Sequence, residues 1–136
     1  MKIPNNICVI EMFCMINPSE DPNKIKKAIS NIFPYSTIIT EDSSIVAQSK
    51  DLNSLEKIFE IIHSRQSQKN YKRNLEKNLE HDTTWFYLNK QAAFVGKIAI
   101  CEQSEESPLG PIKVVLTSSN IDKIIEWLVL GNDTIS

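Results

Sequence analysis

The chain has 136 residues, of which 41% are hydrophobic and 24% are charged, and this balance is typical of an ordinary globular protein. A formal net charge of -2 excludes a protein that binds nucleic acid over its whole surface. The length predicts one domain over residues 1–136, large enough to bury a core without disulfides or a metal.

The first part of the chain predicts a strand, a helix and a hairpin. Apolar residues occupy every even position along residues 7–16, which indicates a strand with one buried face. Asp21 as N-cap and Pro22 at the first helical position predict a helix that ends at Phe33-Pro34. The segments STIIT and SIVAQ, separated by three polar residues, are typical of two paired strands.

A second helical region starts at Asp51, where Asn53 and Glu56 have the spacing of a capping box. Its first apolar stripe contains Leu52, Leu55, Phe59 and Ile62. The next apolar set contains Tyr71, Leu75 and Leu79 and is rotated by roughly 150° at the helix's ~100° per residue. Either the helix kinks near residues 64–67, or its two halves bury different faces.

The last part of the chain predicts three strands and a helix. The strands are TTWFYL, KIAIC and IKVVLT, and the helix is SNIDKIIEWL, with Ser119 or Asn120 as its cap. The complete order lacks the regular alternation of a doubly wound fold. It predicts an α+β protein, with helices layered on a single, mostly antiparallel sheet.

Catalytic signatures are missing from the sequence. Phosphate-loop, dinucleotide, zincin and hydrolase motifs are absent, and His63 and His81 have no metal-ligand spacing. Three cysteines without a CxxC pair indicate core thiols in a cytoplasmic protein; they are Cys8, Cys14 and Cys101. We therefore expect no enzyme, no metal and no cofactor, and an enzyme using Cys101 or a histidine is the least supported alternative.

One region of the chain is basic. Residues 65–97 contain seven basic and three acidic residues, a balance of +4, so the rest of the chain carries -6. Four cations at successive i,i+4 positions predict a row on one helix face, with Lys72 beside it; they are Arg65, Lys69, Arg73 and Lys77. Neighbouring like charges repel by roughly 0.2–0.5 kcal/mol. An anionic polymer would neutralise such a row, and the alternative is a hydrated lysine-rich surface.

The segment LNKQAAFVGK, residues 88–97, has two compatible interpretations. In the structural one, Asn89 and Gln91 satisfy backbone groups where a strand ends, and Gly96 permits a turn. In the functional one, Lys90 and Gln91 lie beside the basic helix and contact phosphate or sugar.

Four motifs together resemble a family of small archaeal proteins predicted to bind RNA or to be exosome-associated subunits. They are RQxxxNxxR from Arg65, FYLNKQAAFVGK from Phe86, ESPLGPIKV from Glu106 and IIEWL from Ile124. The resemblance implies a role with RNA and a fold similar to that of the large-subunit ribosomal protein that binds the small ribosomal RNA. The sequence departs from the family pattern at Gln68, Lys69 and Asn70, and it lacks an Ala-Pro pair after Trp127.

The basic row and the resemblance together predict a non-catalytic protein that contacts the phosphates and sugars of structured RNA. The candidate residues are Arg65, Gln66, Lys69, Lys72, Arg73, Lys77, Asn89, Lys90, Gln91 and Lys97. Base stacking is disfavoured, because the strand that holds Trp85, Phe86 and Tyr87 must turn one face to the core. The alternative is a protein-interaction module, or an accessory subunit of an RNA-processing assembly, without direct RNA contact. No membrane role is expected, and the oligomeric state is left open.

Overall fold

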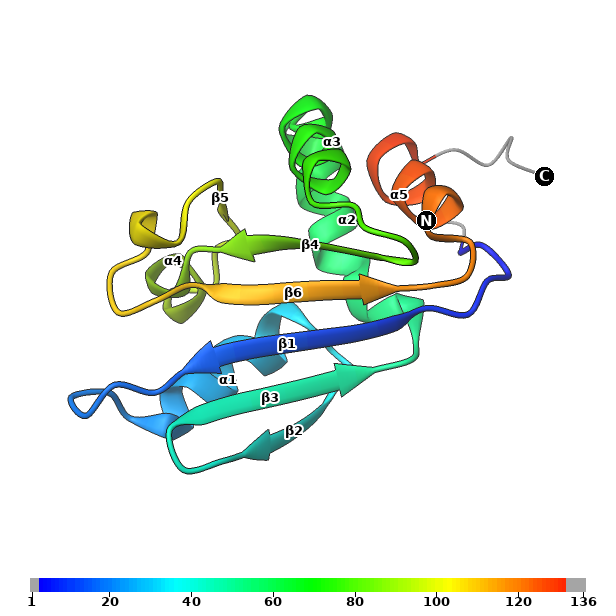
Figure 1. Ribbon diagram of the computed structural model, residues 1–136. Coiled ribbons are helices and arrows are strands. Elements are labelled where there is room, and N and C mark those ends of the chain that lie inside the picture. The colour runs from blue at the N-terminus through cyan, green and yellow to red at the C-terminus, as the bar shows by residue number, and fades with distance from the viewer. Residues whose placement is uncertain (1–2, 132–136) are drawn as a thin grey trace.

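A computed structural model describes residues 3–131 and contains one six-stranded antiparallel sheet with helices packed against it (Figure 1). The strands are β1 Val9–Met15, β2 Thr37–Thr40, β3 Ser44–Ser49, β4 Thr83–Leu88, β5 Ile100–Cys101 and β6 Ile112–Thr117, in the spatial order β2-β3-β1-β6-β4-β5. The helices are α1 Pro22–Ile32, α2 Glu56–Ser64, α3 Gln68–Lys77, α4 Lys90–Phe94 and α5 Ile121–Leu130, and there are two short 3₁₀ turns, η1 Leu52–Leu55 and η2 Ser104–Glu106. The prediction of an α+β fold with a mostly antiparallel sheet is confirmed.

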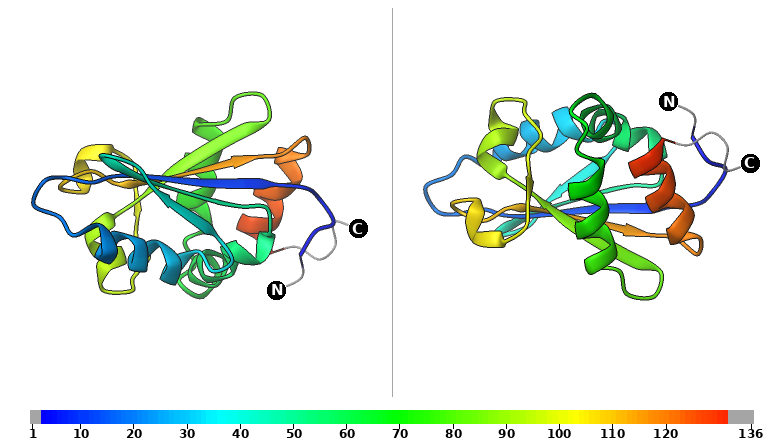
Figure 2. Two further views of the ribbon diagram at one scale, coloured as in Figure 1. Left: turned by 90° about the horizontal axis from the view of Figure 1, so that it is seen from below. Right: turned by 90° about the horizontal axis from the view of Figure 1, so that it is seen from above.

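The central strand β1 has one buried and one outward face, as its alternating sequence predicts. Ile10, Met12 and Cys14 are buried, whereas the odd positions are partly or fully exposed. Met12 lies between Ala47 of β3 and Val114 of β6, both of which are also buried. In the edge-on view of Figure 2, left, helices α1, α2 and α5 lie on one side of the strands.

Helix α1 begins and ends where the sequence predicts. The side chain of Asp21 accepts a hydrogen bond from the backbone N–H of Asn23 at 2.9 Å, and Pro22 occupies the first turn. Phe33 caps the other end, because a residue before proline avoids helical angles. The predicted apolar stripe of this helix is buried; it contains Ile25, Ala28, Ile29 and Ile32.

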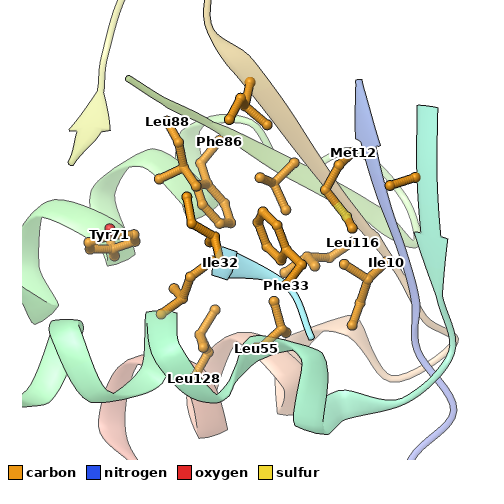
Figure 3. Packing of buried hydrophobic residues seen from close by; sticks show 14 of the residues in the cluster. Ile10, Met12, Ile32, Phe33, Leu55, Tyr71, Phe86, Leu88, Leu116 and Leu128 are labelled. Carbon is orange, nitrogen blue, oxygen red and sulfur yellow. The ribbon is translucent and has the colours of Figure 1, made fainter. Parts of the chain in front are cut away.

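The core lies between the inner face of the sheet and the helices (Figure 3). Phe33 and Leu55 lie against Ile10 and Leu116 of the sheet in that view. Trp127 of α5 is 1% exposed. All these residues belong to one hydrophobic cluster. That residues 1–136 form a single domain stays a prediction. None of the helices in the described part of the chain is long and apolar enough to cross a membrane.

The structure differs from the sequence-based prediction in three local details. The capping box at Asn53 is wrong: Asp51 caps the 3₁₀ turn η1 instead, by accepting from the backbone N–H of Asn53. The predicted strand KIAIC is shortened to Ile100–Cys101. Helix α4 was not predicted, because five residues are too few to show a helical period.

Candidate nucleic-acid interface

The predicted basic helix is two helices, separated by a tight break. Gln66 adopts a left-handed conformation with φ of 53°, and the N–H of Ser67 donates to the carbonyl of Ile62 at 3.0 Å. This bond, from the second residue after the cap back into the last turn, is the Schellman pattern of a helix C-terminus. Of the two alternatives that the rotated apolar stripe left open, the structure shows the first, a break near residues 64–67.

This break corrects the predicted row of four cations. Arg65 caps the C-terminus of α2 and does not lie on α3. The i,i+4 row on one helix therefore contains Lys69, Arg73 and Lys77, each step advancing about 6 Å along the axis. All three are exposed, as are Lys72 and Arg65. We call these five exposed residues the cationic strip.

Replacing Gln66 with glycine is expected to raise the free energy of unfolding by up to about 1 kcal/mol. The left-handed region costs an L residue about 1–2 kcal/mol, and glycine adopts it without that penalty, although it gains entropy when unfolded. Urea denaturation measures the change, and Lys72→Gly, in the interior of α3, is the control that should lose about 1 kcal/mol. A destabilised Gln66→Gly protein would show that the break is not held in this conformation.

Helix α3 is anchored by its buried side, which fixes the direction of the cationic strip. The ring of Tyr71 packs edge-on against Phe86 of β4, with centroids 5.7 Å apart at 72°. The hydroxyl of Thr84 donates to the carbonyl of Leu75 at 2.6 Å. Since Tyr71 and Leu75 are buried, the opposite side of the helix faces outward.

Arg73 is held by two neighbours. Its guanidinium donates to the side-chain oxygen of Asn70 at 2.8 Å and forms an ion pair with Glu102. Asn70 thus orients the guanidinium through a hydrogen bond, and Glu102 supplies the negative charge. The pair is exposed, so it contributes little to stability, and a phosphate could replace the carboxylate of Glu102.

Acidic side chains limit the cationic strip on the side of α5. A groove between α3 and α5 is lined by Lys72 together with Glu76, Asp122 and Glu126. Within residues 3–131, Arg73 is the one member of the strip that forms an ion pair. Arg65, Lys69 and Lys77 are therefore the cations most open to an external anion.

Lys90, in contrast, is completely buried. Its ammonium donates to both carboxylate oxygens of Glu20, at 2.9 and 3.1 Å, and to the carbonyls of Met15 at 3.0 Å and Leu109 at 2.7 Å. These acceptors occupy all three of its hydrogens. The predicted contact between Lys90 and phosphate is therefore wrong, because this lysine links α4 to the loops before α1 and β6.

Glu20 is the buried partner of this lysine, with 6% of its side chain exposed. Burial acts to raise the pKa of its carboxyl, but hydrogen bonds from Asn17 and from Lys90 outweigh this effect. The pKa of Glu20 therefore lies below its ordinary value, and its carboxyl is ionised at neutral pH.

The amides beside Lys90 also have internal partners. The side-chain oxygen of Asn89 accepts from the N–H of Ala92 at 2.9 Å and caps α4. Gln91 donates to the carbonyl of Pro108 and accepts from the hydroxyl of Ser107 at 3.0 Å. LNKQAA and SPLGPI, two of the segments on which the resemblance rests, thus bind each other, which supports the structural interpretation. Lys97, at the end of the segment LNKQAAFVGK, is exposed, unlike Lys90.

The three cysteines and His63 have structural surroundings. Burial raises the pKa of both Cys8 and Cys14 to about 11 and also raises that of Cys101, which is the opposite of what a nucleophilic thiol needs. The ring of His63 lies against that of Phe59, tilted by 37°, with ring centroids 4.2 Å apart. The described residues contain no cluster that could hold a metal.

The outward face of the sheet carries aromatic residues that the sequence reasoning set aside. Phe86 is buried, but Trp85 and Tyr87, on either side of it, point to the other face. Their rings lie 4.8 Å apart. Strict alternation in TTWFYL was the available signal, and it predicts two aromatic rings on whichever face Phe86 does not occupy.

Comparison with known proteins places the chain in a family. A family model described as RNA binding matches residues 9–118. A UPF0201 protein of Sulfurisphaera tokodaii is 39% identical over 117 residues, covering 83% of this chain and 81% of the relative. The chain belongs to the family of UPF0201 proteins. Two crystal structures of UPF0201 proteins share the fold: one has a TM-score of 0.75 at 28% identity, and that from Methanococcus jannaschii has 0.73 at 31%. Each alignment covers 89% of this chain and 92% of the other.

Proposed function

We propose that this UPF0201 protein binds structured RNA without catalysis, through the cationic strip. The observation that carries the proposal is the exposed, i,i+4-spaced row on α3, a helix whose other side is fixed in the core. The match of most of the chain to a family model described as RNA binding supports the same function.

The contacts we propose are to phosphate and sugar. Lysine and arginine side chains on one convex helix fit a row of phosphates, and the deep groove of A-form RNA gives side chains little access to base edges. Gln66 and Lys97, both exposed, are proposed at the edges of this surface. Asn89 and Gln91 are proposed to contribute indirectly, by holding the α4 segment in place. The likeness to the ribosomal protein and the location in the cytoplasm remain proposals.

The test is the affinity of nuclease-treated protein for a structured RNA, measured over a salt series. Four or five phosphate contacts would make log affinity fall against log salt with a slope of about -3.6 to -4.5. A matched double-stranded DNA is the control and should bind more weakly, because its groove widths differ. No binding at low salt would contradict the proposal.

A second candidate function is favoured by the Arg73–Glu102 pair. This pair shows that the strip accepts a carboxylate, so an acidic partner protein could occupy the same surface. A stoichiometric complex that survives nuclease treatment would support this candidate, and loss of the complex with the RNA would exclude it.

A further inference from the structure

The outward face of the sheet is uncovered in the described part of the chain. The helices pack on the other face, where the even residues of β1 lie. Outward side chains come from five neighbouring strands, β2-β3-β1-β6-β4. We call this surface the open sheet face; it contains Thr37, Ile39, Ser44, Val46, Gln48, Val9, Glu11, Phe13, Met15, Lys113, Val115, Thr117, Thr83, Trp85 and Tyr87.

Eight of the fifteen side chains on the open sheet face are apolar or aromatic, and they lie beside one another on neighbouring strands. The strand register places Ile39, Val46, Phe13, Lys113 and Tyr87 in one row across the five strands. Phe13 is 38% exposed and Ile39 is 59% exposed. Exposed apolar side chains gathered on one face in this way mark an interaction site.

The charge of this face argues against RNA as its partner. Its only charged side chains in the described residues are Glu11 and Lys113, which cancel. The ammonium of Lys113 lies 4.6 Å from the centre of the Trp85 ring, so the one cation already covers the aromatic surface. Glu41 and Asp42 lie in the turn that joins β2 to β3, at the edge of the face. A polyanion would therefore find no excess of positive charge here.

We infer that the open sheet face binds a second copy of this chain in a twofold dimer. A twofold interface is isologous, so each copy offers the other the same apolar centre, one carboxylate and one ammonium. The face carries one carboxylate, on Glu11, and one ammonium, on Lys113, and has no net charge. In a twofold dimer the carboxylate of each copy can therefore face the ammonium of the other, so the face is complementary to itself. Because the helices lie on the opposite side of each sheet, the two cationic strips of the dimer would lie on its outer surfaces.

The size of the face sets the expected strength of the dimer. Five strands about 4.8 Å apart and about six residues of 3.3 Å long cover roughly 480 Å² in projection. Interfaces of stable complexes bury about 800 Å² per partner, and side-chain relief adds to the projected area. The dimer should therefore be reversible, forming as the concentration rises from about 1 μM to about 1 mM.

Sedimentation equilibrium over this concentration range tests the inference. The wild-type protein is expected to approach twice the mass of one chain. Phe13→Asp and, separately, Ile39→Asp should weaken association by about thirtyfold or more, since each places a carboxylate in the apolar centre. Leu130→Asp is the matched control: Leu130 is 56% exposed at the end of α5, on the helical side, and its replacement should leave the association unchanged.

Two results would overturn the inference. One is a wild-type chain that stays at the mass of a single copy up to about 1 mM. The other is a Phe13→Asp protein that is folded and loses RNA affinity while its mass distribution matches the wild type, which would assign the face to RNA. Circular dichroism of each variant checks folding, and two independent variants protect the test against the failure of one.

Discussion

The replacement of Lys90 by alanine is expected to lower the free energy of unfolding by about 3–5 kcal/mol. The change leaves the carboxylate of Glu20 buried without its counter-ion and removes the donor to the carbonyls of Met15 and Leu109. Urea denaturation at neutral pH measures the loss. Lys97→Ala, an exposed lysine seven residues along the chain, is the control and should change stability by less than about 0.5 kcal/mol.

The pH dependence of this loss distinguishes a charged pair from simple loss of packing. With Lys90 present, the pKa of Glu20 lies below its ordinary 4.5, so the pair stabilises the protein above that pH and less as the carboxyl is protonated. Without Lys90, only the hydrogen bonds from Asn17 would oppose the effect of burial, so the pKa of Glu20 would rise from its value in the wild type, and protonation would relieve the unpaired charge. The deficit of Lys90→Ala should therefore be largest near neutral pH and shrink below about pH 4. A deficit that is constant with pH, or absent, would contradict the buried pair.

Reversal of three of the four strip cations that form no ion pair in the described residues is expected to lower RNA affinity by at least about 100-fold at physiological salt. The variant is Arg65→Glu, Lys69→Glu and Lys77→Glu, and it turns three attractive contacts into repulsive ones. These residues are exposed and lack an ion-pair partner in the described range, so the melting temperature should change by only a few degrees. Equilibrium titration with fluorescent RNA measures the affinity.

The matched control for this variant reverses three exposed lysines elsewhere, Lys24, Lys27 and Lys50. It changes the net charge by the same amount, so long-range repulsion of RNA is equal in both proteins. An equal loss of affinity in the two variants would mean that net charge, and not the position on α3, determines binding. Unfolding of the strip variant would assign these cations to stability.

Much of the fold could be predicted from local patterns. The alternation in β1, the Asp21-Pro22 start of α1 and the rotated stripe after Ile62 each reflect short-range physics: side-chain direction, capping and helical period. The class of fold and the break before α3 followed from them. Helix α4 has only five residues, too few to show a helical period in the sequence. The hydrogen-bond partners of its side chains lie far away along the chain and depend on tertiary contacts.

The environment of Lys90 is the clearest case of information that local sequence does not carry. Its partner Glu20 lies 70 positions away, and nothing near LNKQAA indicates that the lysine turns inward. A lysine in a polar segment is normally solvated, so the expectation of a phosphate contact was reasonable and wrong. The open sheet face was missed for a related reason: alternation shows that one face is buried, but not whether another layer covers the second.

The most direct test of the RNA surface is an NMR titration of ¹⁵N-labelled protein with a structured RNA. We expect the amide shifts to change between residues 65 and 77 and near Lys97. The shifts of Glu11, Phe13 and Lys113 on the open sheet face should stay unchanged when spectra are compared at one protein concentration. Shift changes centred on the open sheet face instead, or none at saturating RNA, would contradict the claim that the cationic strip is the site where this protein binds RNA.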